Sequence, residues 1–261
     1  MDVNFSKYHG TGNDFVLIDD RDEFFPLNDT SLVKKLCQRR FGIGADGLML
    51  VRKDSNYDFR MIYYNSDGNE STMCGNGGRC IVAFSYKLGI IQNKTSFVAI
   101  DGPHDAEVVE PDYIRLKMID VNEVETGEDY FYLNTGSPHY VRFKDEFNSR
   151  GIVAEAQEIR YNERFKKEGT NVNLVKTKED GLFVRTYERG VEDETYSCGT
   201  GVVASAISAG LKMKDNKTLH NIETLGGRLK VSYEADFEKC EFKNIWLEGP
   251  ATFVFSGTVT I

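Results

Sequence analysis

The sequence contains an internal repeat, because a shift of 124 residues superposes two cysteine-glycine motifs. The first motif reads Cys-Gly-Asn-Gly from Cys74, and the second reads Cys-Gly-Thr-Gly from Cys198. The same gap-free shift superposes Thr11 on Thr135, Tyr63 on Tyr187 and Gly102 on Gly226. One offset held over such a distance indicates duplication. It predicts two halves of similar size, which suits the usual length of compact domains.

Each cysteine precedes a Gly-X-Gly turn and then an apolar run, at 81–84 in the first copy and 202–207 in the second. A helix that is apolar on nearly every face is a buried one, so we expect one central helix in each half. The glycines allow close approach of a ligand, and the first amides of a helix have no partner within it. Such a helix start attracts carboxylates and favours a thiolate over a thiol. Two activated cysteines beside two anion sites are therefore expected.

Short stretches rich in β-formers surround the two helices. In the first half we expect strands at 3–8, 14–19, 48–52, 59–64, 95–101, 106–110 and 113–118. In the second half we expect them at 129–134, 139–143, 171–176, 182–187, 220–233 and 240–248. One further helix is predicted to start at Asp29, with Arg39 and Arg40 in its last turn, and another near 152–160.

The predicted fold is α+β, with two pseudo-symmetric halves. Each half is expected to be a mostly antiparallel β-sheet or barrel wrapped around its central buried helix, with an active site in the cleft between them. The N-terminal half is expected to span 1–118 and the C-terminal half 119–249. The last strand, about 250–261, has no equivalent before residue 124, so we expect it to return and complete the sheet of the first half.

Composition narrows the possible classes of function. The net charge of −9 argues against nucleic acid and against anionic membrane surfaces as partners. No apolar run approaches the roughly 20 residues of a membrane span, and the first residues show no signal-peptide pattern. Five cysteines without framework spacing fit a reducing compartment. A cytoplasmic protein is therefore expected.

Two-fold pseudosymmetry predicts that Cys74 and Cys198 face each other across the cleft. A thiolate on one side of a carbon can remove its proton while a thiol on the other side supplies one, which inverts that carbon. The amides of Gly75 and Asn76, and those of Gly199 and Thr200, would hold the carboxylate of the substrate and stabilise the developing charge.

Seven motifs then identify a resemblance that runs from end to end. They are His9-Gly-Thr-Gly-Asn-Asp-Phe, Phe41-Gly-Ile-Gly-Ala-Asp-Gly, Met73-Cys-Gly-Asn-Gly-Gly-Arg-Cys, Gly136-Ser-Pro-His139, Thr170-Asn-Val, Tyr187-Glu-Arg-Gly and Ser197-Cys-Gly-Thr-Gly. In this order they resemble the diaminopimelate epimerase family. The resemblance implies epimerisation of LL- to meso-diaminopimelate for lysine and peptidoglycan precursors, with no cofactor, pyridoxal phosphate or metal, by a homodimer. Phe255 lies near an aromatic residue that relatives use in the dimer contact.

By resemblance, Cys74 and Cys198 are the two acid/base residues, supported by His139 and Glu188. The substrate-binding residues implied are Asn13, Asn65, Gly75, Asn76, Asn171, Glu188, Arg189, Gly199 and Thr200. The chain departs from the family at Gly47, where glutamine is common, and at Ser137, where asparagine is usual. Its acidic loop at 190–195 is one residue longer than the commonest form.

Other interpretations remain open. A dithiol redox protein would pair Cys74 with Cys198, but it would not explain Glu188-Arg189. A non-catalytic amino-acid-binding module would not need a cysteine in each half, and a relative acting on another amino acid is the alternative within the enzyme class. The remaining cysteines, Cys37, Cys80 and Cys240, are expected to be structural, and the last is placed on a strand. His104 and His220 are expected at the surface, and the Cys74–Cys80 spacing does not suit zinc.

Overall fold

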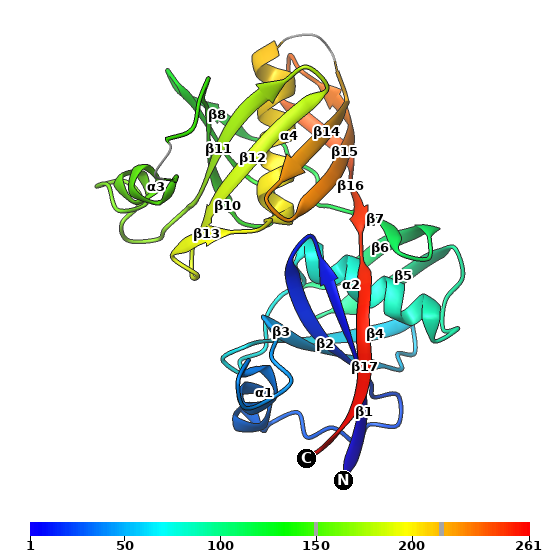
Figure 1. Ribbon diagram of the computed structural model, residues 1–261. Coiled ribbons are helices and arrows are strands. Elements are labelled where there is room, and N and C mark those ends of the chain that lie inside the picture. The colour runs from blue at the N-terminus through cyan, green and yellow to red at the C-terminus, as the bar shows by residue number, and fades with distance from the viewer. Residues whose placement is uncertain (149–150, 214–216) are drawn as a thin grey trace. The chain divides into compact units, whose positions relative to one another are not determined.

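The computed structural model describes residues 1–148, 151–213 and 217–261. The chain divides into two compact units, one formed by 1–116 with 249–261 and one formed by 117–248 (Figure 1). From the sequence we expected the first half to end at residue 118 and the returning strand to begin at about residue 250. Each unit combines β-strands with one long and one short helix, so the predicted α+β fold is confirmed.

The first unit is a mixed sheet. Its elements are β1 (Asp2–Gly10), β2 (Asn13–Asp19), α1 (Thr30–Cys37), β3 (Gly47–Arg52), β4 (Phe59–Asn65), α2 (Gly75–Lys87), β5 (Lys94–Ala99), β6 (Gly102–Glu110), β7 (Tyr113–Lys117) and the returning β17 (Thr252–Thr260). The pairs β2–β3 and β4–β5 are parallel. The pairs β1–β2, β3–β4, β5–β6 and β6–β7 are antiparallel.

The second unit follows the same plan. Its elements are β8 (Val124–Thr126), β9 (Tyr130–Asn134), β10 (Pro138–Phe143), α3 (Val153–Arg160), β11 (Asn171–Lys178), β12 (Gly181–Glu188), β13 (Asp193–Thr195), α4 (Gly199–Met213), β14 (Leu219–Thr224), β15 (Gly227–Asp236) and β16 (Glu241–Pro250). Here β10–β11 and β12–β14 are parallel. The pairs β9–β10, β11–β12, β14–β15 and β15–β16 are antiparallel. The order of parallel and antiparallel pairs is thus repeated between the units, as a duplication requires.

The long helices α2 and α4 form the cores of the two units. All residues of α2 from Gly75 to Ser85 are buried, and α4 is buried at Gly199 and from Gly201 to Gly210. In the first unit α1 packs on the other face of the sheet, against alternate residues such as Val16, Leu48 and Ile62. Both central helices are buried as the apolar runs predicted.

The two units complete their sheets with different strands. β17 pairs antiparallel with β1 along nearly its whole length, so the last strand does return to the first unit. In the second unit the equivalent neighbour of β9 is the short strand β8, also antiparallel. The sequence did not predict β8 or β13, because a strand of three residues is too short to show alternation.

Three local predictions were wrong. Helix α1 ends at Cys37, so Arg39 and Arg40 lie beyond it. Gly42 packs so tightly on α1 that a Cβ there would lie 2.0 Å from the carbonyl oxygen of Lys35, which turns the chain away. Cys240 lies in the turn between β15 and β16. His220 is buried and its Nε2 is 2.8 Å from the Tyr233 hydroxyl, because β14 turns it toward the core.

Removing residues 252–261 tests the role of β17. Without this strand β1 keeps β2 but loses its antiparallel partner on the other side, so the β1 amides that pair with β17 are expected to lose protection from hydrogen exchange. Strands β9 to β12 of the same molecule serve as the control and are expected to keep theirs. Unchanged exchange in β1 would show that β17 does not stabilise the first unit.

Candidate active site

In the first unit, Cys74 caps the amino end of α2. Its Sγ accepts a hydrogen bond from the backbone N–H of Gly77 at 3.2 Å. Gly77 leaves room for this contact, because a Cβ would lie 2.3 Å from the Met49 Cε and 3.1 Å from this Sγ, so both would have to shift. A sulfur that accepts a helix amide is favoured as a thiolate.

Next to this cysteine, Asn76 is held by a buried cation. The Arg79 guanidinium donates to the Asn76 Oδ1 at 3.0 Å and to the Gly75 carbonyl oxygen at 3.0 Å. It also reaches the Thr11 hydroxyl at 3.3 Å. Arg79 is fully buried, and burial lowers its pKa. Its hydrogen bonds within the described ranges go to neutral oxygens, so this cation adds positive potential to the first turn of α2.

Asn13 joins the same cluster from the start of β2. Its Nδ2 donates to the Asp46 carboxylate at 2.7 Å, and its Oδ1 faces the Asn76 Nδ2 at 3.4 Å. Asn65 lies at the end of β4, opposite Gly47 in the sheet, and is exposed. A Cβ at Gly47 would lie 2.6 Å from the Tyr63 ring, so a larger residue would not fit here unless the surroundings shifted.

In the second unit, Cys198 immediately precedes α4 and is 8% exposed. Its Sγ lies 3.4 Å from the Thr200 Oγ1. The Thr135 hydroxyl donates to the Thr200 carbonyl oxygen at 2.8 Å and so ties the β9–β10 loop to the helix start. A threonine hydroxyl is thus within reach of the sulfur.

His139 is fully buried beneath this threonine. Its Nε2 lies 2.9 Å from the Thr200 Oγ1 and 3.0 Å from the Ser137 Oγ, and its Nδ1 lies 3.0 Å from the Asn173 Nδ2. Burial, aided by the positive charge of Arg189, lowers the pKa of His139 to about 3. The imidazole is therefore neutral at neutral pH.

Asn171 begins β11, Glu188 ends the neighbouring strand β12, and Arg189 follows β12 in a turn. The Asn171 Oδ1 accepts the backbone N–H of Arg189 at 2.8 Å, and its Nδ2 donates to the Ser137 Oγ at 3.0 Å. The Glu188 carboxylate accepts from the Thr195 hydroxyl at 3.1 Å. The exposed Arg189 side chain donates to the Glu168 carbonyl oxygen.

Within each unit, hydrogen bonds connect some of the predicted residues: Asn13 with Asn76 in the first, and His139, Asn171, Cys198 and Thr200, with Ser137 between them, in the second. Three supporting residues were missed in the sequence: Asp46, Arg79 and Asn173. Arg79 stands in the first motif, but the apolar run that follows it indicates a buried helix and does not indicate a charged residue that supports the site. Asn173 carries no local signal, because its role depends on strand pairing.

The other cysteines, Cys37, Cys80 and Cys240, do not start a helix. Cys37 and Cys80 are buried, and burial raises the pKa of Cys37 to about 12 and that of Cys80 further. Both thiols are therefore neutral, as a structural role predicts. Over residues 1–148, 151–213 and 217–261, no three or more His, Cys, Asp and Glu residues gather to hold a metal ion. The helices in these ranges are also too short or too polar to cross a membrane.

The fold is shared with several solved structures. A PhzF-family phenazine biosynthesis protein from Bacillus anthracis matches with a TM-score of 0.77 at 14% identity, covering 100% of both chains. A hydroxyproline epimerase from Agrobacterium vitis matches with a TM-score of 0.68 at 14% identity, covering 99% of this chain and 92% of the other. At this identity the matches show the fold alone, which is shared by proteins named as an epimerase and as a phenazine biosynthesis protein.

Sequence comparison gives the family. The model of the diaminopimelate epimerase family matches residues 5–121 and 131–254. A diaminopimelate epimerase from Flavobacterium psychrophilum is 53% identical, over 97% of this chain and 98% of its own. That from Aquifex aeolicus is 38% identical, over 99% and 98%. The chain belongs to the diaminopimelate epimerase family.

The neutral His139 makes stability depend on pH. The unfolded chain takes up a proton at this histidine near pH 6.5, whereas the folded protein does so only near pH 3. The free energy of unfolding is therefore expected to fall as the pH is lowered through this window, by about 2 kcal/mol between about pH 7 and about pH 5. Urea unfolding of the wild type and of His139→Gln measures the difference. An equal pH dependence in both would contradict a neutral buried His139.

Proposed function

We propose that the protein epimerises LL-2,6-diaminopimelate to meso-diaminopimelate with Cys74 and Cys198 as acid and base. The observation that carries the proposal is a cysteine immediately before each of two buried helices, in a member of this family. The same chemistry requires the two sulfurs to lie on opposite faces of the reacting carbon. Lysine and peptidoglycan precursors are the expected use of the product, in the cytoplasm, where thiols stay reduced.

The reaction balances without a cofactor. One cysteine, as thiolate, takes the α-proton and becomes a thiol, leaving a carbanion stabilised by its carboxylate. The other cysteine, as thiol, gives its proton to the opposite face and becomes a thiolate. The first amides of α2 and α4, at Gly75-Asn76 and Gly199-Thr200, are proposed to hold the carboxylate, since helix starts bind anions and preorganised amides stabilise developing charge.

The remaining predicted residues are proposed to select the substrate. Asn13 and Glu188 would contact the reacting amine, while Asn65, Asn171 and Arg189 would hold the distal amino-acid end. A guanidinium suits this task because it can take a carboxylate in a fork. The exposed side chain of Arg189, with its backbone held by Asn171, supports the assignment.

Exchange of the α-proton tests the proposal. The reduced protein, without added cofactor, is given LL-diaminopimelate in deuterated water. Deuterium at one α-carbon and formation of the meso product are expected, and both are expected to be lost in Cys74→Ala and Cys198→Ala. Cys240→Ala, which changes the thiol in the β15–β16 turn, is the matched control and is expected to stay active.

The outcomes separate the alternatives. If the protein exchanges the α-proton of proline or another amino acid but not that of diaminopimelate, the thiol mechanism stands and the substrate assignment is wrong. No exchange with any amino acid would favour the redox or binding interpretation.

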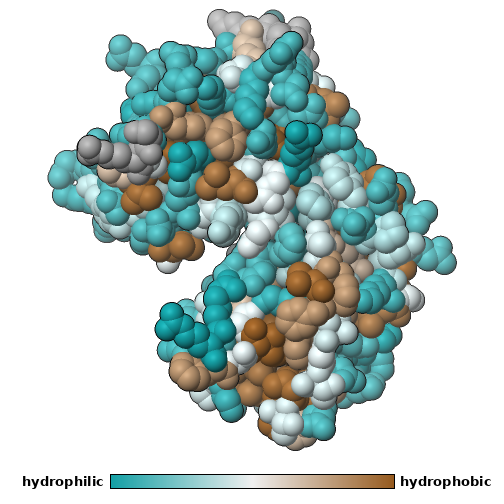
Figure 2. All heavy atoms as spheres, in the orientation of Figure 1, coloured by the Kyte–Doolittle hydropathy of each residue, from teal (hydrophilic) through white to brown (hydrophobic). Residues whose placement is uncertain are grey.

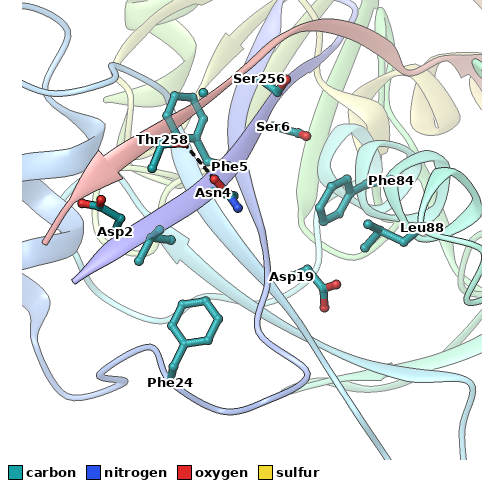
Figure 3. A pocket seen from close by; sticks show the side chains of 12 residues that line it. Asp2, Asn4, Phe5, Ser6, Asp19, Phe24, Phe84, Leu88, Ser256 and Thr258 are labelled. Carbon is teal, nitrogen blue, oxygen red and sulfur yellow. Dashed lines mark hydrogen bonds between the residues drawn. The ribbon is translucent and has the colours of Figure 1, made fainter.

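We also propose a homodimer in which β17 contributes to the contact. Its residues Phe253, Val254 and Phe255 are 41%, 49% and 45% exposed, so apolar groups are bare on both faces of the strand. Beside it, a hollow of about 540 Å³ is lined by parts of β1, β17 and the end of α2 (Figure 3). Figure 2 also shows hydrophobic residues gathered on the visible face of the first unit.

Sedimentation equilibrium tests the dimer. The wild type is expected to show twice the chain mass of 29.6 kDa, and Phe255→Glu is expected to dissociate because a buried unpaired charge is costly. Val109→Glu, at an exposed apolar residue of β6, is the control and is expected to leave the mass unchanged. A wild-type monomer, or dissociation by the control alone, would contradict the role of β17.

A further inference from the structure

The second unit buries three polar side chains where the first unit buries apolar ones. His139, Asn173 and Thr186 are at most 3% exposed. The corresponding positions in the sheet of the first unit are Phe15, Met49 and Tyr63, since Met49 pairs with Tyr63 as Asn173 pairs with Thr186, and all three are core residues of that unit. Packing of this fold therefore does not require polar groups here. Because burying them is costly, they need another explanation.

The hydrogen bonds of Asn173 fix the direction of its amide. Its Nδ2 donates to the Tyr140 carbonyl oxygen at 3.2 Å, which can only accept, and its Oδ1 accepts from the Thr186 hydroxyl at 2.9 Å. The same Nδ2 faces the His139 Nδ1 at 3.0 Å. That ring nitrogen must therefore accept, and the proton of the neutral imidazole lies on Nε2.

The hydroxyl groups above the imidazole take their direction from this proton. The His139 Nε2–H points to the oxygens of Thr200 and Ser137. Ser137 also accepts from the Asn171 Nδ2, whose orientation is fixed by the Pro138 carbonyl oxygen at 3.1 Å. The Ser137 hydroxyl hydrogen is then directed to the Thr200 Oγ1 at 3.2 Å.

The Thr200 Oγ1 therefore accepts hydrogen bonds from His139 and Ser137, and it also lies next to the Cys198 sulfur. Its own hydroxyl hydrogen is left for the Cys198 Sγ at 3.4 Å. A hydrogen bond donated to an ionised acceptor is stronger than one between neutral groups, so this arrangement favours the thiolate.

We propose that Asn173 is a positioning residue that sets the direction of a hydrogen-bond chain through His139 and Thr200 and so stabilises the Cys198 thiolate. The inference rests on the proposed acid/base role of Cys198. In this chain His139 is a neutral donor and neither accepts the substrate proton nor balances the thiolate charge. The charged or titratable groups facing it are Arg189 and, beyond Thr200, Cys198 itself.

The tautomer of His139 provides a test on the wild-type protein. Nitrogen-15 NMR of histidine-labelled protein, assigned with His139→Gln, is expected to show protonated Nε2 and unprotonated Nδ1 from about pH 5 to about pH 8. The Nδ1–H tautomer, or a doubly protonated ring in this range, would overturn the inference. This measurement needs no variant of Asn173 to fold.

Alkylation of Cys198 tests the effect on the sulfur. In a Cys74→Ala background, iodoacetamide labelling of the Cys198 peptide is followed by mass spectrometry against pH. Asn173→Asp is expected to reverse the donors and acceptors of this hydrogen-bond chain. The Asp carboxylate can only accept, so it would accept from a proton on the His139 Nδ1 and leave the Nε2 without one. The Thr200 hydroxyl then turns to the imidazole, so labelling near pH 7 is expected to slow about tenfold.

The matched control is Tyr233→Phe. It removes buried hydrogen bonds to His220 and to the Ala206 carbonyl oxygen of α4, but it does not touch the chain that ends at Cys198. Its labelling rate is expected to stay unchanged. Equal slowing in both variants would indicate general loosening of α4 and overturn the inference.

Failure of the proposed function remains distinguishable. If labelling and the tautomer behave as expected while diaminopimelate shows no exchange, the hydrogen-bond chain stands and the substrate assignment falls. If exchange occurs but Asn173→Asp labels at the wild-type rate, the epimerase stands and the role of Asn173 falls.

Discussion

The amino end of a buried helix is the constraint on which both units depend. Helix geometry leaves its first amides without partners inside the helix, and burial removes water that could satisfy them. Glycines at these positions keep the amides accessible to a ligand, and the preceding cysteine accepts one of them in the first unit. The strands matter to function because they hold this helix end in place and bring supporting side chains beneath it.

The duplicated scaffold meets this constraint in two chemically different ways. The first unit has the buried cation Arg79 at the fifth position of α2, reaching back to Gly75 and Asn76, where the second unit has Val203. The second unit instead uses neutral donors, with His139 and Asn173 beneath Thr200. The Cys74 sulfur is thus supported by the positive charge of Arg79, and the Cys198 sulfur is supported by the oriented dipoles of neutral side chains. A duplicated fold can therefore keep its geometry while its two halves diverge in electrostatics.

Much of the fold could be predicted because the repeat supplied each pattern twice. The shift of 124 residues places α2 at the start of α4, and β3 at the start of β11, although α1 was predicted to extend too far. Its true end depends on the close packing of Gly42, which no local pattern encodes. Motifs located Cys74 and Cys198, but the contacts of Asn173 arise from strand pairing, so only the folded structure identifies its partners.

The return of β17 also sets the order in which the units can be completed during synthesis. The second unit is one continuous segment, 117–248, and all of it has been made before the final strand appears. The first unit begins earlier but needs 249–261, so its sheet cannot close until those residues have been made. The first unit is therefore completed after the second, although its first strands are made earlier. Cys74 belongs to the unit that is completed only when β17 has been made.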